Sequence, residues 1–307
     1  MIESTRPPVH ASGSRDHSLA EIPATAHGAA MPAFTLAALL MIASGSIHAV
    51  VNAIVKGGRD KAAGRAVTDG TSALILLPAT LFVPLPHGAW GWLAASAIIH
   101  GCYLYALVRA YQVGDLSAVY PVLRGTAPLI AAGVTIGVLG ESATAGQIAG
   151  IALIGAAMFV MIAGRHLGRA ALGWSLLTGL CIASYTVIDA IGVRAAPSPA
   201  SYIVWVFVEM GAVVVAMFGI LSRGTMFAAA RAQWRPGAIA GALSILTYGM
   251  ALTAFSLGPT APLAALRETG MVTALLISIL VLKERATIGR VVGVFGILAG
   301  AALILAG

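Results

Sequence analysis

Charged side chains are scarce in this sequence: Asp, Glu, Lys and Arg together make up 9% of its 307 residues. A soluble domain carries about 25% charged residues, and no soluble fold could bury a composition that is 59% hydrophobic. The scarcity of charge therefore indicates an integral membrane protein. The net charge of +7 does not indicate nucleic acid as a partner, because the basic residues lie in short loops and form no continuous patch.

Cysteine is almost absent as well. Cys102 and Cys181 both lie in apolar segments, so we expect two small buried hydrophobic side chains without a disulfide or a metal site. The sequence also lacks the Gly-x-x-x-x-Gly-Lys phosphate loop and the His-x-x-x-His, Gly-x-Ser-x-Gly and paired-aspartate motifs. We therefore expect no ATPase domain, no cofactor, no metal and no enzymatic activity.

The first 32 residues contain no long apolar run and are rich in Ser, Pro, Ala and His. This composition predicts a disordered tail over residues 1–32. The first apolar segment is long enough to span a membrane and no clear cleavage site follows it, so we do not expect a secretory signal. Whether translation starts at Met1 or Met31 stays open.

Ten segments after the tail are apolar over about the 20 residues that a membrane-crossing helix needs. The loops between them are short, and no soluble domain is inserted. The sequence therefore predicts an all-α integral membrane protein of the inner or plasma membrane, with ten transmembrane helices in contact with the lipid bilayer. The predicted spans are 33–55, 66–83, 89–111, 117–139, 144–163, 171–192, 200–221, 236–256, 261–282 and 287–306.

The loop charges predict an orientation. Thirteen Lys and Arg residues lie on the side of the odd-numbered loops and three on the side of the termini. Because basic loops stay in the cytoplasm, the count places both termini outside.

The two halves of the chain resemble each other. Residues 118–164 align with 261–307 without a gap, and 17 of the 47 positions are identical. The alignment pairs Arg124 with Arg267 inside the segments "VYPVLRGTAPL" and "APLAALRETGM". Near the start of each half, "HAVVNAI" matches "YTVIDAI". Since each repeat holds five spans, the second copy enters the membrane with the opposite orientation, and this inverted-topology repeat is typical of secondary transporters.

The blocks "VLGESATAGQIAG" and "VLKERATIGRVVG" carry a more specific resemblance. The first contains Gly140-Glu141, Thr144, Gln147 and Gly150, and it resembles the EamA domain of the drug/metabolite transporter superfamily. The second departs from the pattern at Lys283 and Arg290. The resemblance implies two EamA repeats, over residues 33–164 and 171–307, and a carrier that often exports small metabolites or drugs. It also implies cytoplasmic termini, in conflict with the loop charges, so the orientation stays open.

Five ionisable residues inside predicted spans are candidates for the functional site, because a charge there costs at least about 2.5–3.5 kcal/mol. Such groups face the protein interior, and buried ion pairs are seldom retained for stability alone. An arginine suits an anionic substrate, and a desolvated carboxylate suits a proton carrier. We interpret the arginines as cavity residues and the carboxylates as candidates for proton coupling, with a purely structural ion-pair network as the alternative. The residues are Arg124, Arg267, Glu268, Glu209 and Asp189.

Several uncharged polar side chains share the faces of these spans. His48 and Asn52 are four residues apart, on one side of the first span. Tyr185 occupies the matching place in the sixth span, Tyr103 lies in the third, and Tyr120 precedes Arg124 in the fourth. We add these five residues to the predicted substrate cavity; interhelical hydrogen bonding and packing are the alternatives.

Prolines and glycines mark further positions. Pro121 and Pro128 in the fourth span, with Pro259 and Pro262 at the ninth, predict interrupted helices at matching places in both halves. Glycines four residues apart predict close helix packing, with a homodimer seam left open; the pairs are Gly133/Gly137, Gly146/Gly150, Gly289/Gly293 and Gly296/Gly300.

The residues before two predicted spans suit helix starts. Thr144 and Gln147 are spaced as a capping box. Glu141 and Glu284 precede the predicted starts of the fifth and tenth spans, where the helix dipole favours a carboxylate. We expect all four residues to be structural.

The function that the sequence predicts is secondary transport of a small molecule, as export by alternating access. A flippase for lipid-linked sugars or phospholipids on the same scaffold is the main alternative. An intramembrane enzyme and a non-transporting scaffold are weaker ones. Neither substrate nor ion coupling follows from the sequence.

Overall fold

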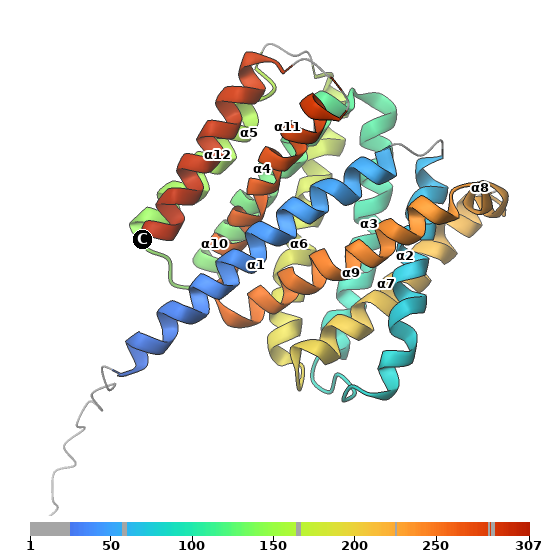
Figure 1. Ribbon diagram of the computed structural model, residues 1–307, viewed down its shortest axis with the longest axis horizontal. Helices are drawn as coiled ribbons and strands as arrows, with labels where there is room; N and C mark the ends of the chain where they lie inside the picture. The colour runs from blue at the N-terminus through green and yellow to red at the C-terminus, as the bar shows by residue number, and fades with distance from the viewer. Residues whose placement is uncertain (1–24, 57–59, 164–166, 225, 282, 284–285) are drawn as a thin grey trace, which may run out of the picture.

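The computed structural model describes residues 25–56, 60–163, 167–224, 226–281, 283 and 286–307, and every regular element within these ranges is a helix (Figure 1). Residues 1–24 of the predicted tail lie outside the described residues, and α1 already begins at Thr25. The elements are α1 (Thr25–Lys56), α2 (Lys61–Leu76), η1 (Leu77–Leu81), α3 (Trp90–Val113), α4 (Leu116–Gly137), α5 (Ala145–Val160), α6 (Arg169–Ala195), α7 (Pro199–Leu221), α8 (Met226–Ala232), α9 (Trp234–Leu257), α10 (Thr260–Leu266), η2 (Arg267–Thr269), α11 (Gly270–Leu280) and α12 (Ile288–Ala306).

Eight helical segments of the described chain are long and apolar enough to cross a membrane, with α10, η2 and α11 counted as one segment. The predicted spans 66–83 and 144–163 correspond to α2 with η1 and to α5. Both α-helices have 16 residues, about 24 Å at 1.5 Å per residue, which is less than the ~30 Å hydrocarbon core. The chain is therefore a multi-pass helical membrane protein, while the count of ten spans stays a prediction.

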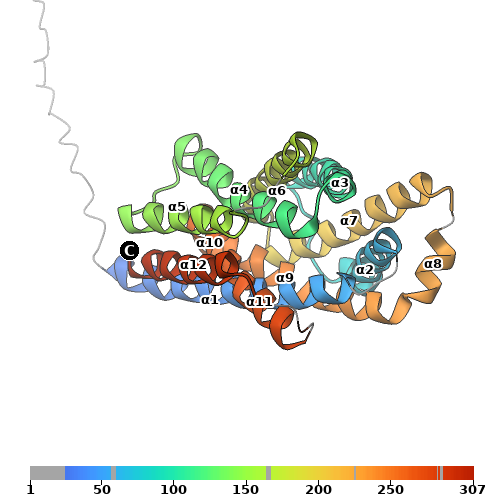
Figure 2. The same cartoon turned by 90° about the horizontal axis from the view of Figure 1, so that it is seen from above.

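The helices form two layers (Figure 2). One layer contains α3, α4 and α6, and the other contains α1, α9 and the α10–α11 segment. At one edge α5 packs on α12, and at the other α2 packs on α7. Each layer combines helices from both halves of the sequence, so any space between the layers is lined by both halves.

The end of the bundle where α3 begins and α6 ends is tightly packed. Its hydrophobic cluster includes Met41, Leu93, Tyr202 and Leu263, which are at most 1% exposed. The helix α10 lies within this cluster, and Ser201 Oγ donates to the Pro84 carbonyl at the same end. Close packing closes this end of the molecule.

The ninth predicted span is interrupted, whereas the fourth is not. At Arg267–Thr269 the helix tightens into the 3₁₀ turn η2. The helix α4 runs without a break past Pro121 and Pro128. The expectation of matched interruptions in both halves is therefore wrong for α4. The interruption at η2 places Arg267 and Glu268 in the middle of the membrane-spanning segment.

The glycines predicted to pack closely do so in α5 and α12. A Cβ atom on Gly150 would lie 2.5 Å from the Gly300 carbonyl oxygen, and one on Gly300 would lie 2.7 Å from that of Gly150. Gly133 and Gly137 differ, because a Cβ at either position would meet nothing within 4 Å. The prediction of close packing is wrong for that pair within this chain.

The capping box at Thr144 is confirmed. Gln147 N donates to Thr144 Oγ1, and Thr144 N donates to Gln147 Oε1, both over 3.1 Å. The two reciprocal bonds satisfy free donors at the start of α5. The prediction for Glu284 lies outside the described residues.

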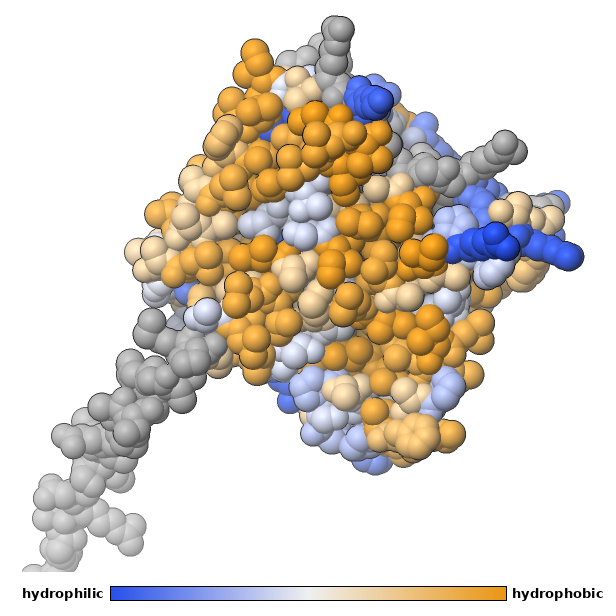
Figure 3. All heavy atoms as spheres, in the orientation of Figure 1, coloured by the Kyte–Doolittle hydropathy of each residue, from blue (hydrophilic) through white to orange (hydrophobic). Residues whose placement is uncertain are grey.

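Apolar side chains dominate the face in Figure 3, over α12, α1 and α9, and hydrophilic side chains gather towards the upper right, where α1 ends and α2 begins. This pattern suits a surface in contact with lipid. Cys181 is buried as expected, but Cys102 is exposed on α3. The expectation of two buried cysteines is wrong for Cys102, since hydropathy does not tell a lipid-facing position from a core position.

Candidate functional site

A cavity of about 650 Å³ lies within the helix bundle, in the size range of small-molecule sites. Its lining residues come from the middle of the bundle and from the end where α1 ends and α2 begins. Asp115 and Arg290 mark its mouth there, whereas Met41, Leu93, Tyr202 and Leu263 at the opposite end are not part of its described lining. The cavity therefore runs from the centre towards the end with most of the loop arginines and lysines.

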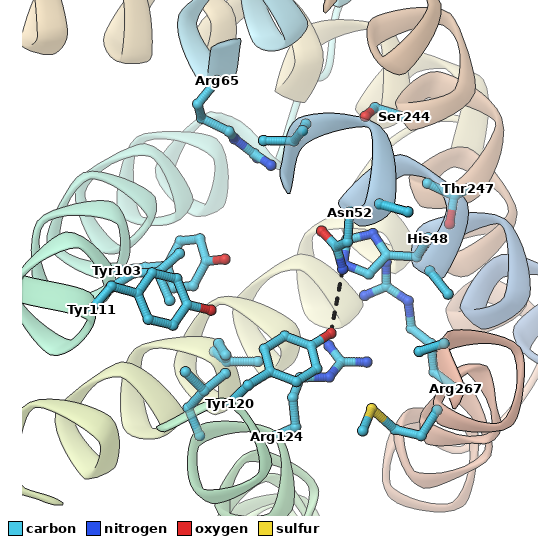
Figure 4. A pocket seen from close by; sticks show the side chains of 18 of the residues that line it. His48, Asn52, Arg65, Tyr103, Tyr111, Tyr120, Arg124, Ser244, Thr247 and Arg267 are labelled. Carbon is cyan, nitrogen blue, oxygen red and sulfur yellow. Dashed lines mark hydrogen bonds between the residues drawn. The ribbon is translucent and has the colours of Figure 1, made fainter. Parts of the chain in front are cut away.

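The structure places all seven predicted cavity residues in the lining of this one cavity. They come from α1, α3, α4, α6 and η2, and Figure 4 shows six of them around a common space. The seven are His48, Asn52, Tyr103, Tyr120, Arg124, Tyr185 and Arg267.

Two of these residues connect α1 with α4. Asn52 Nδ2 donates a hydrogen bond of 3.3 Å to Tyr120 Oη (Figure 4). His48 lies one turn before Asn52 and also lines the cavity. The spacing of four residues thus directs both polar side chains of α1 to the inside.

Arg124 forms an ion pair across the two layers. Its Nε lies 2.9 Å from Glu268 Oε2, and both side chains are less than 10% exposed. The contact lacks the alignment of a hydrogen bond. Arg124 belongs to the first half and Glu268 to the second, so the pair joins the halves at the centre of the molecule. Glu268 contacts the cavity through Arg124 and is not itself part of the lining.

Arg267 is held differently. Its Nε donates to Ser44 Oγ over 3.2 Å, and its guanidinium lies 5.6 Å from the ring centroid of Tyr248. Ser44 is in turn fixed by a 2.7 Å bond to the Thr247 carbonyl. No ion pair found among the described residues includes Arg267. Ser44 and the Tyr248 ring therefore orient the guanidinium.

The turn at η2 lies directly against α1. A Cβ atom on Gly45 would lie 2.2 Å from the Arg267 carbonyl oxygen, and one on Gly270 would lie 2.3 Å from that of Gly45. Only glycine allows this approach of two backbones. Neither glycine was predicted from the sequence to be important, although the close contact between α1 and η2 positions Arg267.

Aromatic rings form another part of the wall. The rings of His100 and Tyr185 stack at 4.1 Å between centroids, and Tyr103 meets Tyr185 edge to face at 5.6 Å. His100 Nδ1 lies 2.9 Å from the Ser96 carbonyl. These contacts fix the rings and leave an aromatic surface towards the cavity.

Asp189 lies behind this wall. Its side chain is fully buried and accepts hydrogen bonds from Tyr202, over 2.8 Å, and from Tyr248. It does not line the cavity, but Tyr248 does. Asp189 therefore communicates with the cavity only through the Tyr248 hydroxyl.

Glu209 does not belong to the site. It is partly buried on α7, whereas Phe207 and Met210 of the same helix line the cavity. Each residue turns a helix by about 100°, so Glu209 points to another face. Glu209 therefore does not line the cavity, and its role as a candidate for proton coupling stays a prediction.

Several residues that line the cavity were not predicted from the sequence. Arg65 Nε lies 2.7 Å from Asp69 Oδ2, and Asp69 is 2% exposed. Arg65 was predicted to be a loop charge, because the predicted span starts at residue 66 while α2 starts at Lys61. The sequence does contain a signal for this ion pair, because the arginine and the aspartate are four residues apart beside an apolar run. Tyr111 and Tyr248 also line the cavity and were not predicted to do so.

Glu141 closes the opposite end and does not support the start of α5 as predicted. Its carboxylate accepts bonds from Arg194 Nη1 over 2.8 Å, Thr260 N over 2.7 Å and Thr260 Oγ1 over 2.8 Å. Arg194 also donates to the carbonyls of Phe255 and Gly258. We call Glu141, Arg194 and Thr260 the end cluster. The carboxylate does lie at a helix start, but it is that of α10 in the second half.

The end cluster determines the protonation of Glu141. Partial burial would raise the pKa of the Glu141 carboxyl, but the hydrogen bonds from Arg194 and Thr260 outweigh burial and hold the pKa below its usual range. The carboxylate is therefore charged at neutral pH and able to accept all three bonds.

The described residues offer no metal site, since they contain no group of three or more His, Cys, Asp or Glu side chains that could hold an ion. The cavity instead presents guanidinium groups, tyrosine hydroxyls and aromatic faces. These groups can bind an organic molecule by hydrogen bonds, charge and stacking.

The fold and the cavity define a multi-pass helical membrane protein with a small-molecule-sized chamber between two helix layers. Residues 169–306 match the family described as the EamA-like transporter family. The chain therefore carries an EamA domain of a transporter family in its second half, and the resemblance seen in the sequence is confirmed there.

One solved structure similar to this chain is described only as "Crystal structure of protein". The two are 15% identical, with a TM-score of 0.64, over 89% of this chain and 97% of that one. At this identity the similarity shows the fold alone. No curated protein sequence matches the chain significantly.

Proposed function

We propose that the protein is a secondary transporter that exports a small metabolite or drug across the inner or plasma membrane by alternating access. The observation that carries this proposal is the cavity of about 650 Å³ between the two layers, which extends to one end of the bundle only. A chamber with one mouth and one closed end is what a carrier needs in one of its two states.

The packing of the helices supports a pseudo-twofold relation between the halves. In the first layer α3 and α4 pack on α6, and in the second α9 and α11 pack on α1. If the helices of the first half are exchanged for the corresponding helices of the second, the contacts within one layer become the contacts within the other. The contacts of α2 with α7 and of α5 with α12 stay the same under this exchange. A structure with this relation can convert one state into the other by exchanging the conformations of its halves.

The end cluster supports the same mechanism. It joins the loop after α4 to α6 and α10, and so connects both halves at the closed end. Opening this end requires these hydrogen bonds to break. By the distribution of loop charges, the mouth of the cavity faces the cytoplasm.

A counterflow assay in proteoliposomes tests the proposal. Vesicles loaded with one unlabelled compound at a time from a panel of amino acids, sugars, phosphorylated metabolites and cationic drugs receive the same compound in labelled form outside. We expect transient accumulation of at least one compound above empty vesicles. Absence of counterflow for the whole panel, with folded protein in the vesicles, would contradict transport.

A further inference from the structure

The three arginines at the centre of the cavity differ in their ionic partners. Arg65 is paired with Asp69 at 2.7 Å and Arg124 with Glu268 at 2.9 Å. Arg267 is 9% exposed and takes part in none of the ion pairs of the described residues. Two of the three charges are thus compensated within the protein, and the third is available to a ligand.

The surroundings of Arg267 fix its direction. Ser44 holds Nε, and the Tyr248 ring lies against the guanidinium. Figure 4 shows the guanidinium beside His48 and Asn52, inside the cavity, and the bond to Ser44 uses Nε and not the terminal nitrogens. The two terminal nitrogens of an oriented guanidinium match the two oxygens of a carboxylate.

Asp189 does not supply the carboxylate that would pair with Arg267. Its carboxylate is fully buried behind Tyr248 and accepts hydrogen bonds from Tyr202 and Tyr248. The Tyr248 ring lies between this carboxylate and the cavity. Asp189 can lower the positive potential near Arg267, but it leaves the cavity-facing nitrogens without an anionic partner.

The wall across from Arg267 is suited to an apolar body. Tyr103 and Tyr111 lie on the far side of the cavity from Arg267, and their hydroxyls point into it (Figure 4). His100 and Tyr185, which also line the cavity, stack at 4.1 Å. Aromatic faces contribute area for stacking and the hydroxyls contribute a few donors. This wall indicates a ligand with a ring or a branched apolar group.

The charges at the centre of the cavity favour an anion with a single negative charge. The described lining contains no lysine, and Arg65 and Arg124 at its centre are already paired, while Arg290 lies at the mouth. A dianion such as a phosphate monoester would keep one charge uncompensated in a site of low dielectric, which is costly. A carboxylate matches the single free guanidinium.

From these relationships we infer that the transported substrate is a small organic monocarboxylate with an aromatic or branched apolar body, whose carboxylate binds Arg267. The inference rests on the proposed transport function and names the chemical class of its substrate. The cavity volume of about 650 Å³ accommodates such a molecule with its hydrating waters.

Three probes of one shape test the charge preference in the unmodified protein. They are 3-phenylpropionate, the neutral 3-phenylpropanamide and the cationic 3-phenylpropylamine. Their binding to purified protein in detergent is measured by calorimetry, with phenyl phosphate as a fourth probe. We expect the carboxylate to bind at least about 10-fold more tightly than the other three, because the amide and the amine gain no charge-assisted pair and the phosphate keeps one charge uncompensated. Equal affinities, or a preference for the amine or the phosphate, would overturn the inference.

Variants then locate the carboxylate. R267Q should weaken 3-phenylpropionate binding by about 10- to 100-fold, while R267K should keep part of the affinity. R235Q is the matched control, because Arg235 lies exposed over Trp234 outside the cavity. Wild-type affinity in R267Q would overturn the role of Arg267. If R267Q does not fold, the comparison of the four probes in the unmodified protein still tests the inference.

The counterflow assay separates this inference from the transport proposal. Counterflow of neutral or cationic compounds but of no carboxylate would reject the substrate class and keep transport. Selective binding of 3-phenylpropionate without counterflow of any compound would keep the binding site and reject transport.

Discussion

Arg194 Nη1 donates a hydrogen bond of 2.8 Å to Glu141 Oε1, and this bond ties the end of α6 to the loop between α4 and α5. The two residues are 53 positions apart and belong to different halves of the sequence. Thr260 at the start of α10 completes the contact by donating to the same carboxylate through N and Oγ1. The closed end of the bundle is therefore joined by a small set of hydrogen bonds to one carboxylate.

The end cluster makes stability depend on pH. The pKa of Glu141 is lowered in the folded state, so its contribution is complete above the unfolded pKa of about 4.3 and is lost as pH falls through the folded pKa. We expect E141Q to lower the free energy of unfolding at neutral pH by about 1 kcal/mol or less, since Arg194 is 35% exposed and screened. Thermal unfolding in detergent at a series of pH values measures this difference.

The same series contains its own control. Below the folded pKa of Glu141, the unmodified protein and E141Q should unfold at nearly the same temperature, because both then carry a neutral side chain. A gap between them that is unchanged or wider at acid pH would show that Glu141 does not act through its charge.

The ion pair between Arg124 and Glu268 predicts strong coupling of two substitutions. Replacing either residue alone leaves a buried charge without its partner, at a cost of about 3–5 kcal/mol. The double variant R124M/E268Q should recover part of this loss. A double-mutant cycle of unfolding in mixed detergent micelles measures the coupling. Strictly additive single effects would contradict the pair.

The crossing of α1 with η2 predicts that glycine is required at two positions. G45A and G270A should each destabilise the protein by about 1–3 kcal/mol, since the added methyl group lies within about 2.3 Å of a backbone carbonyl oxygen. G133A is the matched control, because nothing lies within 4 Å of its added atom. Unfolding temperatures of the three variants test the claim, which fails if G45A and G270A behave like G133A.

Proton coupling, if it is part of the mechanism, should depend on Glu268 and not on Glu209. Glu268 touches the cavity residue Arg124, whereas Glu209 lies on another face of α7. We expect E268Q to abolish the response of efflux to an imposed pH gradient in proteoliposomes, and E209Q to retain it. Efflux that ignores the gradient in the unmodified protein would remove proton coupling from the account.

Much of the architecture could be predicted because lipid imposes simple rules. A helix that crosses the hydrocarbon core has to be long and apolar, so every predicted span overlaps helical residues of the described chain. A charge inside such a span has to face the interior, so Arg124 and Arg267 could be assigned to a cavity. His48 and Asn52 could be assigned to the cavity as well, because residues four apart lie on one face of a helix.

The remaining features depend on contacts between distant residues. Glu141 and Thr260 are 119 positions apart, and no local pattern connects them. Hydropathy gives the length of a helix but not the direction of each face, so Cys102 was assigned to the interior although it is exposed. The start of α2 was placed five residues too late because Arg65 and Asp69 lower the hydropathy of that helix, and these two residues form an ion pair in the cavity wall.

Alternating access is tested most directly by labelling one cysteine in the cavity from each side of the membrane. Cys102 and Cys181 are first replaced by Ala, and Ser244, which lines the cavity, is changed to Cys. An impermeant maleimide is then added to vesicles of either orientation. We predict fast labelling from the basic end at rest and, during counterflow, labelling from the opposite end as well, with faster labelling there when E141Q opens the end cluster. Labelling from one side only under all of these conditions would contradict the account.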